Sequence, residues 1–156
     1  MRIENKTEID DNMVRALLTF AAKSVKCNHD NVLVKINRGR GGWGAGVRGI
    51  AINHWFEPKT IRLTIPLVVN CCYSDEINLV KSVYRVAQHE FAHIKDYKEG
   101  TYKQSPVKNG RRQHHDKRPC EIYANTAVMF AKKYDLDDLI LEIALQIENA
   151  HRKSIR

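Results

Sequence analysis

The chain has few of the features that mark whole classes of protein. It has only 4 cysteines among 156 residues and no Cys-x-x-Cys pair, which excludes a disulfide framework and favours buried free thiols. No apolar run approaches the roughly 18 residues that a membrane-spanning helix needs. The first residues also lack the apolar segment of a secretory signal. We therefore expect a soluble protein of the cytoplasm.

Acidic residues are the minority charge. Asp and Glu number 18 against 26 Lys and Arg, which leaves a formal net charge of +8. Such a balance favours association with nucleic acid, acidic proteins or anionic surfaces, without choosing among them. The length and the 43% hydrophobic content predict one domain over residues 1–156, with a core large enough to fold alone.

Hydrophobic spacing predicts a helix, a small sheet and then further helices. The first amphipathic helix should begin near Thr7 and Asp10, read as a capping pair, and continue to about residue 27. Three short strands rich in β-branched residues are expected at 32–36, 47–53 and 60–65. Pro58 and Pro66 flank the third of these, which predicts that it lies at the edge of the sheet.

The second half of the chain is predicted to be helical. Apolar spacing indicates helices at about 75–99, 119–134 and 137–153, and a polar, basic loop joins the first two. We therefore expect an α+β fold with a small, twisted, mostly antiparallel sheet. The sheet should pack on the N-terminal helix and on the helix at 75–99, and further helices should follow.

The second predicted helix contains His-Glu-x-x-His at His89, Glu90 and His93. Residues four apart project from one face of a helix about one turn apart, so both imidazoles can reach the same zinc ion. Glu90 then lies beside the ion, where a carboxylate can act as a base. The motif is in mid-helix between apolar residues, which is the context that this chemistry needs.

Glu121 is the predicted third ligand. It begins the next helix, far enough after His93 for the chain to return antiparallel beside the first helix. Asn125 follows four residues later on the same face, where its amide can hydrogen-bond a ligand histidine and fix the ring.

Other residues are alternatives to Glu121 as the third zinc ligand. Asp96 shares a helical face with the two histidines, but it rises about 4.5 Å beyond His93 along an unbroken helix, which is far for a short side chain. We expect it to support the site or to form a salt bridge. His114 and His115, on the connecting loop, are alternative zinc ligands.

With His89-Glu90-x-x-His93 followed by Glu121-x-x-x-Asn125, the chain resembles the gluzincin metallopeptidases, especially the very short cytoplasmic or phage-associated members. The resemblance covers about 60 residues and implies a zincin-like fold with Zn²⁺ held by His89, His93 and Glu121. It also implies an edge strand over the zinc that pairs with extended substrate, here 60–65. The family often has Asp at the position of Asn125.

The resemblance implies peptide-bond hydrolysis. Zinc polarises the scissile carbonyl and lowers the pKa of its bound water, and Glu90 takes the proton and passes it to the leaving amine. The family adds a residue that steadies the oxyanion. Its candidates in this chain are Tyr102, His114, His115 and Tyr123.

The basic loop from Lys98 to Arg118 suggests an alternative function. It carries seven Lys or Arg residues against Glu99 and Asp116, so it can recruit nucleic acid or an acidic substrate. The alternative is a DNA-associated protein, either a non-enzymatic basic zinc-binding module or a protease of the crosslink-repair type. In that protease type the third ligand is a histidine, so the choice between Glu121 and His114 or His115 separates the two readings.

Overall fold

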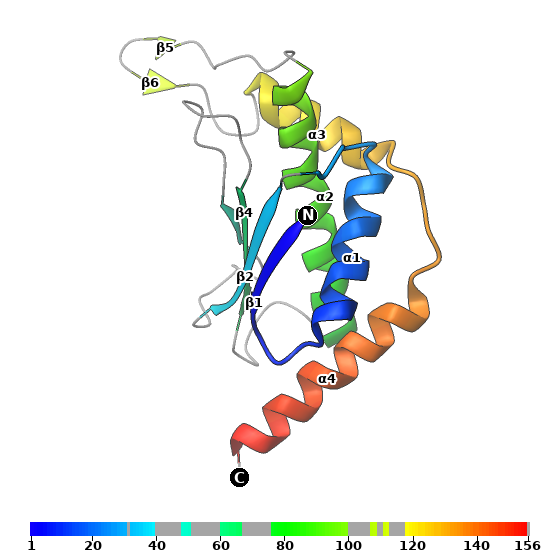
Figure 1. Cartoon of the computed structure of the whole chain (residues 1–156). Helices are drawn as coiled ribbons and strands as arrows, with labels where there is room; N and C mark the ends of the chain where they lie inside the picture. The colour runs from blue at the N-terminus through cyan, green and yellow to red at the C-terminus, as the bar shows by residue number, and fades with distance from the viewer. Residues whose placement is uncertain are drawn as a thin grey trace.

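The computed structural model describes residues 1–30, 32–39, 48–50, 60–66, 76–99, 107–108, 111–112 and 118–155. Its elements are, in order, β1 (Arg2–Lys6), α1 (Asp11–Ser24), β2 (Leu33–Gly39), β3 (Arg48–Ile50), β4 (Thr60–Pro66), α2 (Glu76–Lys98), β5 (Val107–Lys108), β6 (Arg111–Arg112), α3 (Pro119–Met129) and α4 (Asp137–Ile155). Figure 1 shows α1 and α2 on one side of the sheet formed by β1, β2 and β4. The described helices include none that is both long and apolar enough to cross a membrane.

The main sheet is mostly parallel, so the expectation of a mostly antiparallel sheet is wrong. Its strand order is β1-β2-β4-β3, with β1 and β2 parallel, β2 and β4 parallel, and only β3 antiparallel to β4. The sequence reading missed β1. Because α1 connects β1 to its neighbour β2, the chain returns to the same end of the sheet before β2 begins, and the two strands run parallel.

The expectation that 60–65 forms an edge strand is also wrong. β4 lies between β2 and β3, so the segment 60–65 is internal. The edge strands of the described sheet are β1 and β3. Pro66 is the last residue of β4 and pairs in register with Gly39, so its missing N–H leaves the ladder before it unbroken. Pro58, the other flanking proline, lies outside the described residues.

The two faces of the sheet differ in polarity. Val34 and Ile36 of β2 are buried in the core. Alternate residues point to the opposite face, where Glu4 lies 3.8 Å from Arg2 and 3.9 Å from Lys35. One face of the sheet therefore meets the helices and the other carries charge.

α1 begins at a side-chain cap. The carboxylate of Asp10 accepts hydrogen bonds from the backbone N–H groups of Asn12 and Met13, at 2.9 and 3.2 Å, which satisfies two of the donors that a helix leaves free. Thr7 donates instead to the side chain of Asn5. Asp10 alone is therefore the cap of the predicted pair.

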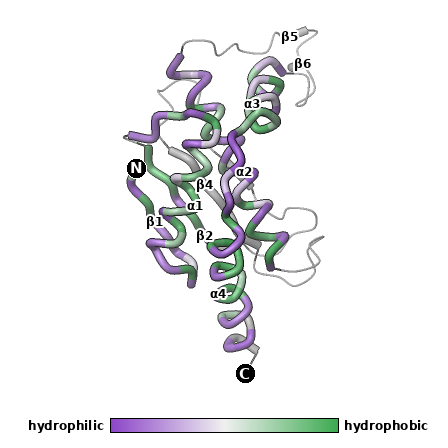
Figure 2. The backbone as a smooth tube through the Cα atoms, turned by 90° about the vertical axis from the view of Figure 1, so that its right-hand side faces the viewer, coloured by the Kyte–Doolittle hydropathy of each residue, from purple (hydrophilic) through white to green (hydrophobic). Residues whose placement is uncertain are grey.

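The hydrophobic core lies between β2, α1, α2 and α4. Its fully buried large side chains include Leu18, Val34, Phe91 and Ile143. Figure 2 shows hydrophobic stretches on β2 and α1, and an alternation of hydrophobic and hydrophilic residues along α4. All four predicted helices are present, but α3 ends at Met129, earlier than expected. Cys27 and Cys120 are free and buried, as predicted, whereas Cys71 and Cys72 lie outside the described residues.

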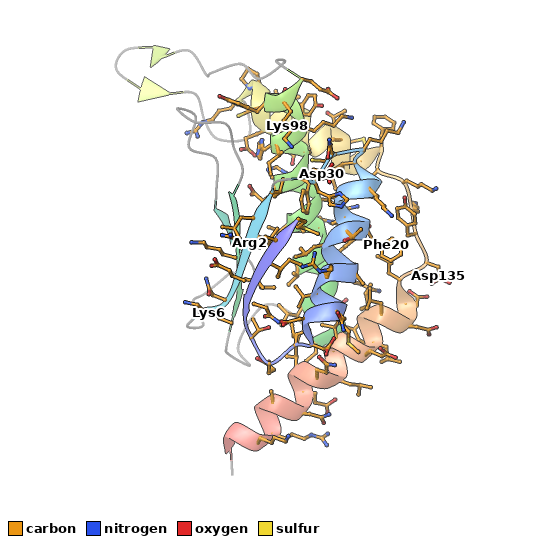
Figure 3. The ribbon with its side chains drawn as sticks, viewed as in Figure 1. Arg2, Lys6, Phe20, Asp30, Lys98 and Asp135 are labelled. Atoms are coloured by element: carbon orange, nitrogen blue, oxygen red, sulfur yellow. The ribbon has the colours of Figure 1, made fainter. Side chains whose placement is uncertain are left out.

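Tertiary contacts hold the ends of the helices. The ring of Phe20 packs against that of Tyr134, with ring centroids 5.0 Å apart, on the side of α1 where the chain leads into α4 (Figure 3). The ammonium group of Lys98 donates to the carbonyls of Asn28 and Asp30, at 3.1 and 3.4 Å. These contacts tie the end of α2 to the segment between α1 and β2, so the helix that carries the His-Glu-x-x-His sequence is held at its C-terminal end.

Candidate metal centre

The His-Glu-x-x-His sequence lies in the most buried part of α2. Its neighbours Phe91 and Ala92 are fully buried, and helical spacing places His89 and His93 one turn apart. α3 packs along α2. Since Ala124 of α3 is also fully buried and both alanines are small, the two helices can approach closely at this level.

The structure brings the three predicted ligands together. The Nε2 atom of His89 lies 2.8 Å from Oε2 of Glu121, and Nε2 of His93 lies 3.1 Å from Oε1 of the same carboxylate. The two Nε2 atoms are 3.0 Å apart. The imidazole rings are nearly perpendicular, at 87°, with centroids 4.6 Å apart. Three potential ligand atoms from two helices thus converge on one point.

The spacing of these nitrogen and oxygen atoms fits a small metal ion. A tetrahedral zinc site with bonds of about 2.0–2.1 Å separates its ligand atoms by about 3.3 Å. The observed separations of 2.8 to 3.1 Å need only a slight opening to reach that value. The buried cluster of His89, His93 and Glu121 can therefore hold a metal ion.

Protons alone do not satisfy the three contacts. The carboxylate only accepts, and each Nε2 of a neutral imidazole is either a donor or an acceptor. If both Nε2 atoms donate to Glu121, two N–H groups face each other across 3.0 Å. If one Nε2 atom is instead an acceptor, its lone pair points at an oxygen of the Glu121 carboxylate, which also only accepts. If both are acceptors, their two lone pairs also face each other. A cation removes the conflict because it takes a lone pair from all three groups.

The second ring nitrogen of His93 contributes no anchor within the described structure. Its Nδ1 atom is buried and has no hydrogen-bond partner among the residues that the structure describes. A histidine that binds a metal through Nε2 carries its proton on Nδ1. Within the described part of the chain, the ring is therefore oriented by the contacts of its Nε2 atom and by packing.

The cluster shifts the ionisation of its members. Burial raises the pKa of the Glu121 carboxyl, but hydrogen bonds and positive charge from His89 and His93 outweigh burial and hold this pKa well below its usual value. Burial lowers the pKa of His89, but the hydrogen bond and charge of Glu121, together with the charge of Glu90, raise it overall. Glu121 is thus ionised at neutral pH, which is the form that binds cations.

Solvent reaches the cluster unevenly. The side chain of His89 is 22% exposed, whereas those of His93 and Glu121 are 7% and 11% exposed. The cluster therefore meets solvent mainly beside His89. A catalytic zinc site keeps one open position for water or substrate, and this side of the cluster is where such a ligand can enter.

Two further residues act on the cluster, and a third lies beside it in the sequence. Glu90 is buried and its charge acts on His89, as its place in the motif predicts. A hydrogen bond that the Asn125 side chain accepts from His89 also raises the pKa of His89, in line with the predicted supporting role. The sequence reading missed Gln88, which is buried and donates to Ser24 at 2.9 Å. Its amide lies on the apolar side of a predicted helix, and this was the sequence feature that could have indicated a buried hydrogen bond.

The competing residues do not join the cluster within the described structure. Asp96 is 1% exposed, yet the group of potential ligands among the described residues does not include it. The hydroxyl of Tyr123 donates to Glu99 at 3.4 Å. Tyr102, His114 and His115 lie outside the described residues.

No protein-family model matches the chain, and no curated protein or solved structure matches it. The functional argument therefore depends on the site itself. Donor type and geometry still limit the chemistry, because they select among metal ions and reaction types.

Proposed function

We propose that the chain is a zinc-dependent metallopeptidase in which His89, His93 and Glu121 hold the metal and Glu90 is the general base. One observation carries the proposal, namely the convergence of two imidazole nitrogens and one carboxylate on a common point. The helix α2, which carries both histidines, also provides the adjacent buried carboxylate of Glu90 that hydrolysis needs.

Two nitrogen donors and one oxygen donor favour zinc. Imidazole suits zinc and several other transition metals, whereas calcium and magnesium prefer sites made of oxygen alone. Catalytic zinc sites use three protein ligands and leave one position free, and two His with one Glu is a known ligand set for peptide hydrolysis. The partly exposed side of the cluster, at His89, is consistent with such a site.

The residues divide the work of hydrolysis. When bound, zinc supplies Lewis acidity, which polarises a carbonyl and lowers the pKa of a water molecule. Glu90 accepts a proton from the water as the new C–O bond forms. It then delivers this proton to the leaving nitrogen as the C–N bond breaks, so one carboxylate acts first as base and then as acid.

Metal analysis of protein purified without a polyhistidine tag tests the ligand set. We expect about one zinc per chain in the wild type and loss of zinc in Glu121→Ala, because two imidazoles alone bind zinc weakly. Glu99→Ala is the matched control. It removes an exposed carboxylate at the end of α2 that pairs with Lys95, and it should keep its zinc.

Two outcomes would overturn the assignment. Zinc retained in Glu121→Ala and lost in His115→Ala would move the third ligand to the basic loop and favour the crosslink-repair type of protease. Absence of zinc from the wild type, also after incubation with zinc salts, would remove the metal site altogether.

Glu90→Gln tests the general base. The amide keeps the size of the side chain but does not accept a proton, so hydrolysis of a labelled unfolded protein such as casein should fall about 10²- to 10⁴-fold. Zinc content should stay at the wild-type level. Glu142→Gln, an exposed position on α4, is the control, and turnover near the wild-type rate in Glu90→Gln would contradict the mechanism.

A further inference from the structure

The last helix has a second face that the described fold leaves uncovered. α4 is anchored through Ile140, Ile143, Ala144 and Ile147, which are buried, and it packs on α2 and α1. Beyond Ile147, none of its described side chains is buried. Figure 1 shows this half of α4 extending past the rest of the fold.

The uncovered face carries a regular pattern. Leu141 and Leu145 are each 47% exposed, although leucine is mostly found inside proteins. Asp138, Leu145 and Arg152 are spaced seven residues apart. With about 100° of rotation per residue, these residues and Leu141 fall within an arc of about 60°, well away from the buried Ile143. A seven-residue repeat along one stripe is typical of helices that pair with another helix.

Apart from Glu148, the charged side chains along this helix are separated by sign. Its exposed start carries acidic residues at 137, 138 and 142, and its exposed end carries basic residues at 152 and 153. Asp138 and Arg152 lie at equal distances in sequence on either side of Leu145. If two copies of the helix are related by a two-fold axis at Leu145, Asp138 of each copy lies opposite Arg152 of the other. The pair of helices therefore contains two such contacts.

We propose that α4 is a homodimerisation surface, on which two copies of the chain pair antiparallel with Leu145 at the crossing point. Leu141 lies beside the crossing, and an Asp138–Arg152 ion pair forms at each end. A parallel pair would instead place Asp138 against Asp138 and Arg152 against Arg152, so charge selects the antiparallel arrangement. Arg152 already pairs with Glu148 of its own helix, and its five N–H donors can serve both carboxylates.

The contact between the two copies of α4 is small. The stripe from Asp138 to Arg152 is about 21 Å long and contributes two leucines from each copy. This is small for a protein interface, so the dimer should be weak and reversible. The proposal is independent of the proposed peptidase activity, because the metal cluster is formed by α2 and α3.

Sedimentation of the full chain, from low-micromolar to sub-millimolar concentration, tests the surface. We expect a concentration-dependent dimer in the wild type and a monomer throughout this range for Leu145→Glu. Met129→Glu is the matched control, because Met129 is 75% exposed but lies on α3. It should dimerise like the wild type. Circular dichroism should show equal helix content in all three proteins.

Charge exchange tests the antiparallel register. Asp138→Arg and Arg152→Asp should each weaken the dimer at least about tenfold, since each places like charges opposite one another. The double variant, and an equimolar mixture of the two single variants, should recover it. A monomeric wild type, equal effects of Leu145→Glu and Met129→Glu, or no recovery on charge exchange would overturn the proposal. Unchanged zinc content in the monomeric variants separates this result from a failure of the metal site.

Discussion

Without metal, Glu121 and His89 stabilise the fold over different ranges of pH. The lowered pKa of Glu121 means that its contribution is present above the ordinary value of 4.5 and is lost as the pH falls below it. The raised pKa of His89 means that its contribution is full below the ordinary value of 6.5 and is lost as the pH rises through the higher folded-state value. Both contributions are complete only in the mildly acidic range between these values, 4.5 and 6.5.

We therefore predict a pH-dependent effect of Glu121→Gln on the metal-free protein. Measured by urea denaturation with a chelator present, the loss of stability should be largest between pH 4.5 and 6.5. We expect about 1.5–3 kcal/mol, the range for hydrogen bonds to charged groups. A loss that is constant from pH 4 to 9 would contradict this. Excess zinc should shift the largest loss toward higher pH, because protons compete with the metal for the imidazoles.

At the residue scale, the convergence of His89, His93 and Glu121 could be predicted because it depends on spacing. His89 and His93 follow from helical periodicity alone, and Glu121 from the need for a third ligand on a returning helix. Two features could not be predicted: Nδ1 of His93 has no hydrogen-bond partner among the described residues, and Gln88 donates to Ser24. They depend on how α2 packs, which no local pattern records.

Among the elements, α4 has two faces whose energetic roles should differ. Ile143 is 1% exposed, whereas Leu141 is 47% exposed. We predict that Ile143→Ala lowers the free energy of unfolding by about 2–5 kcal/mol, because it leaves a cavity among buried side chains. Leu141→Ala should cost less than about 1 kcal/mol.

The comparison requires urea denaturation at low-micromolar concentration, where α4 should be unpaired. Equal losses for the two variants would contradict the packing described for this helix. Circular dichroism of both variants before denaturation is the control for helix content. Neither variant should lose helix, because both replacements introduce alanine, the best helix former.

The elements themselves were predictable to different degrees. The helices follow from apolar spacing and from caps such as Asp10, and Asp137 begins α4 as expected. The sheet was predicted poorly, because β1 has only Ile3 as a large apolar residue and shows little hydrophobic pattern. Without β1, nothing indicated that α1 connects neighbouring strands, and parallel pairing could not be anticipated.

At the scale of the molecule, the metal cluster joins two parts of the chain. His89 and His93 belong to α2, Glu121 belongs to α3, and the sequence between these helices is long and basic. An ion bound to all three restrains α3 on α2 in addition to side-chain packing. The hydrophobic core is formed mainly by α1, α2, β2 and α4, and α3 contributes the partly buried Ala127 to its margin.

We therefore predict a local effect of metal removal. A chelator should increase amide hydrogen exchange in α3 several-fold, because its opening no longer requires release of the ion. Exchange in α1 should change little. Equal increases in both helices would show instead that the ion supports the whole fold. No increase in α3 would contradict the restraint of α3 on α2 by the ion.

The distance in sequence between the ligands has a consequence for the newly made chain. His89 and His93 come together as soon as one helix forms, whereas Glu121, 28 residues after His93, arrives only when α3 docks. A chain at an earlier stage offers two ligands and holds zinc poorly. If the chain is the peptidase we propose, its activity begins only after folding, and its own unfolded segments are spared while they are most vulnerable.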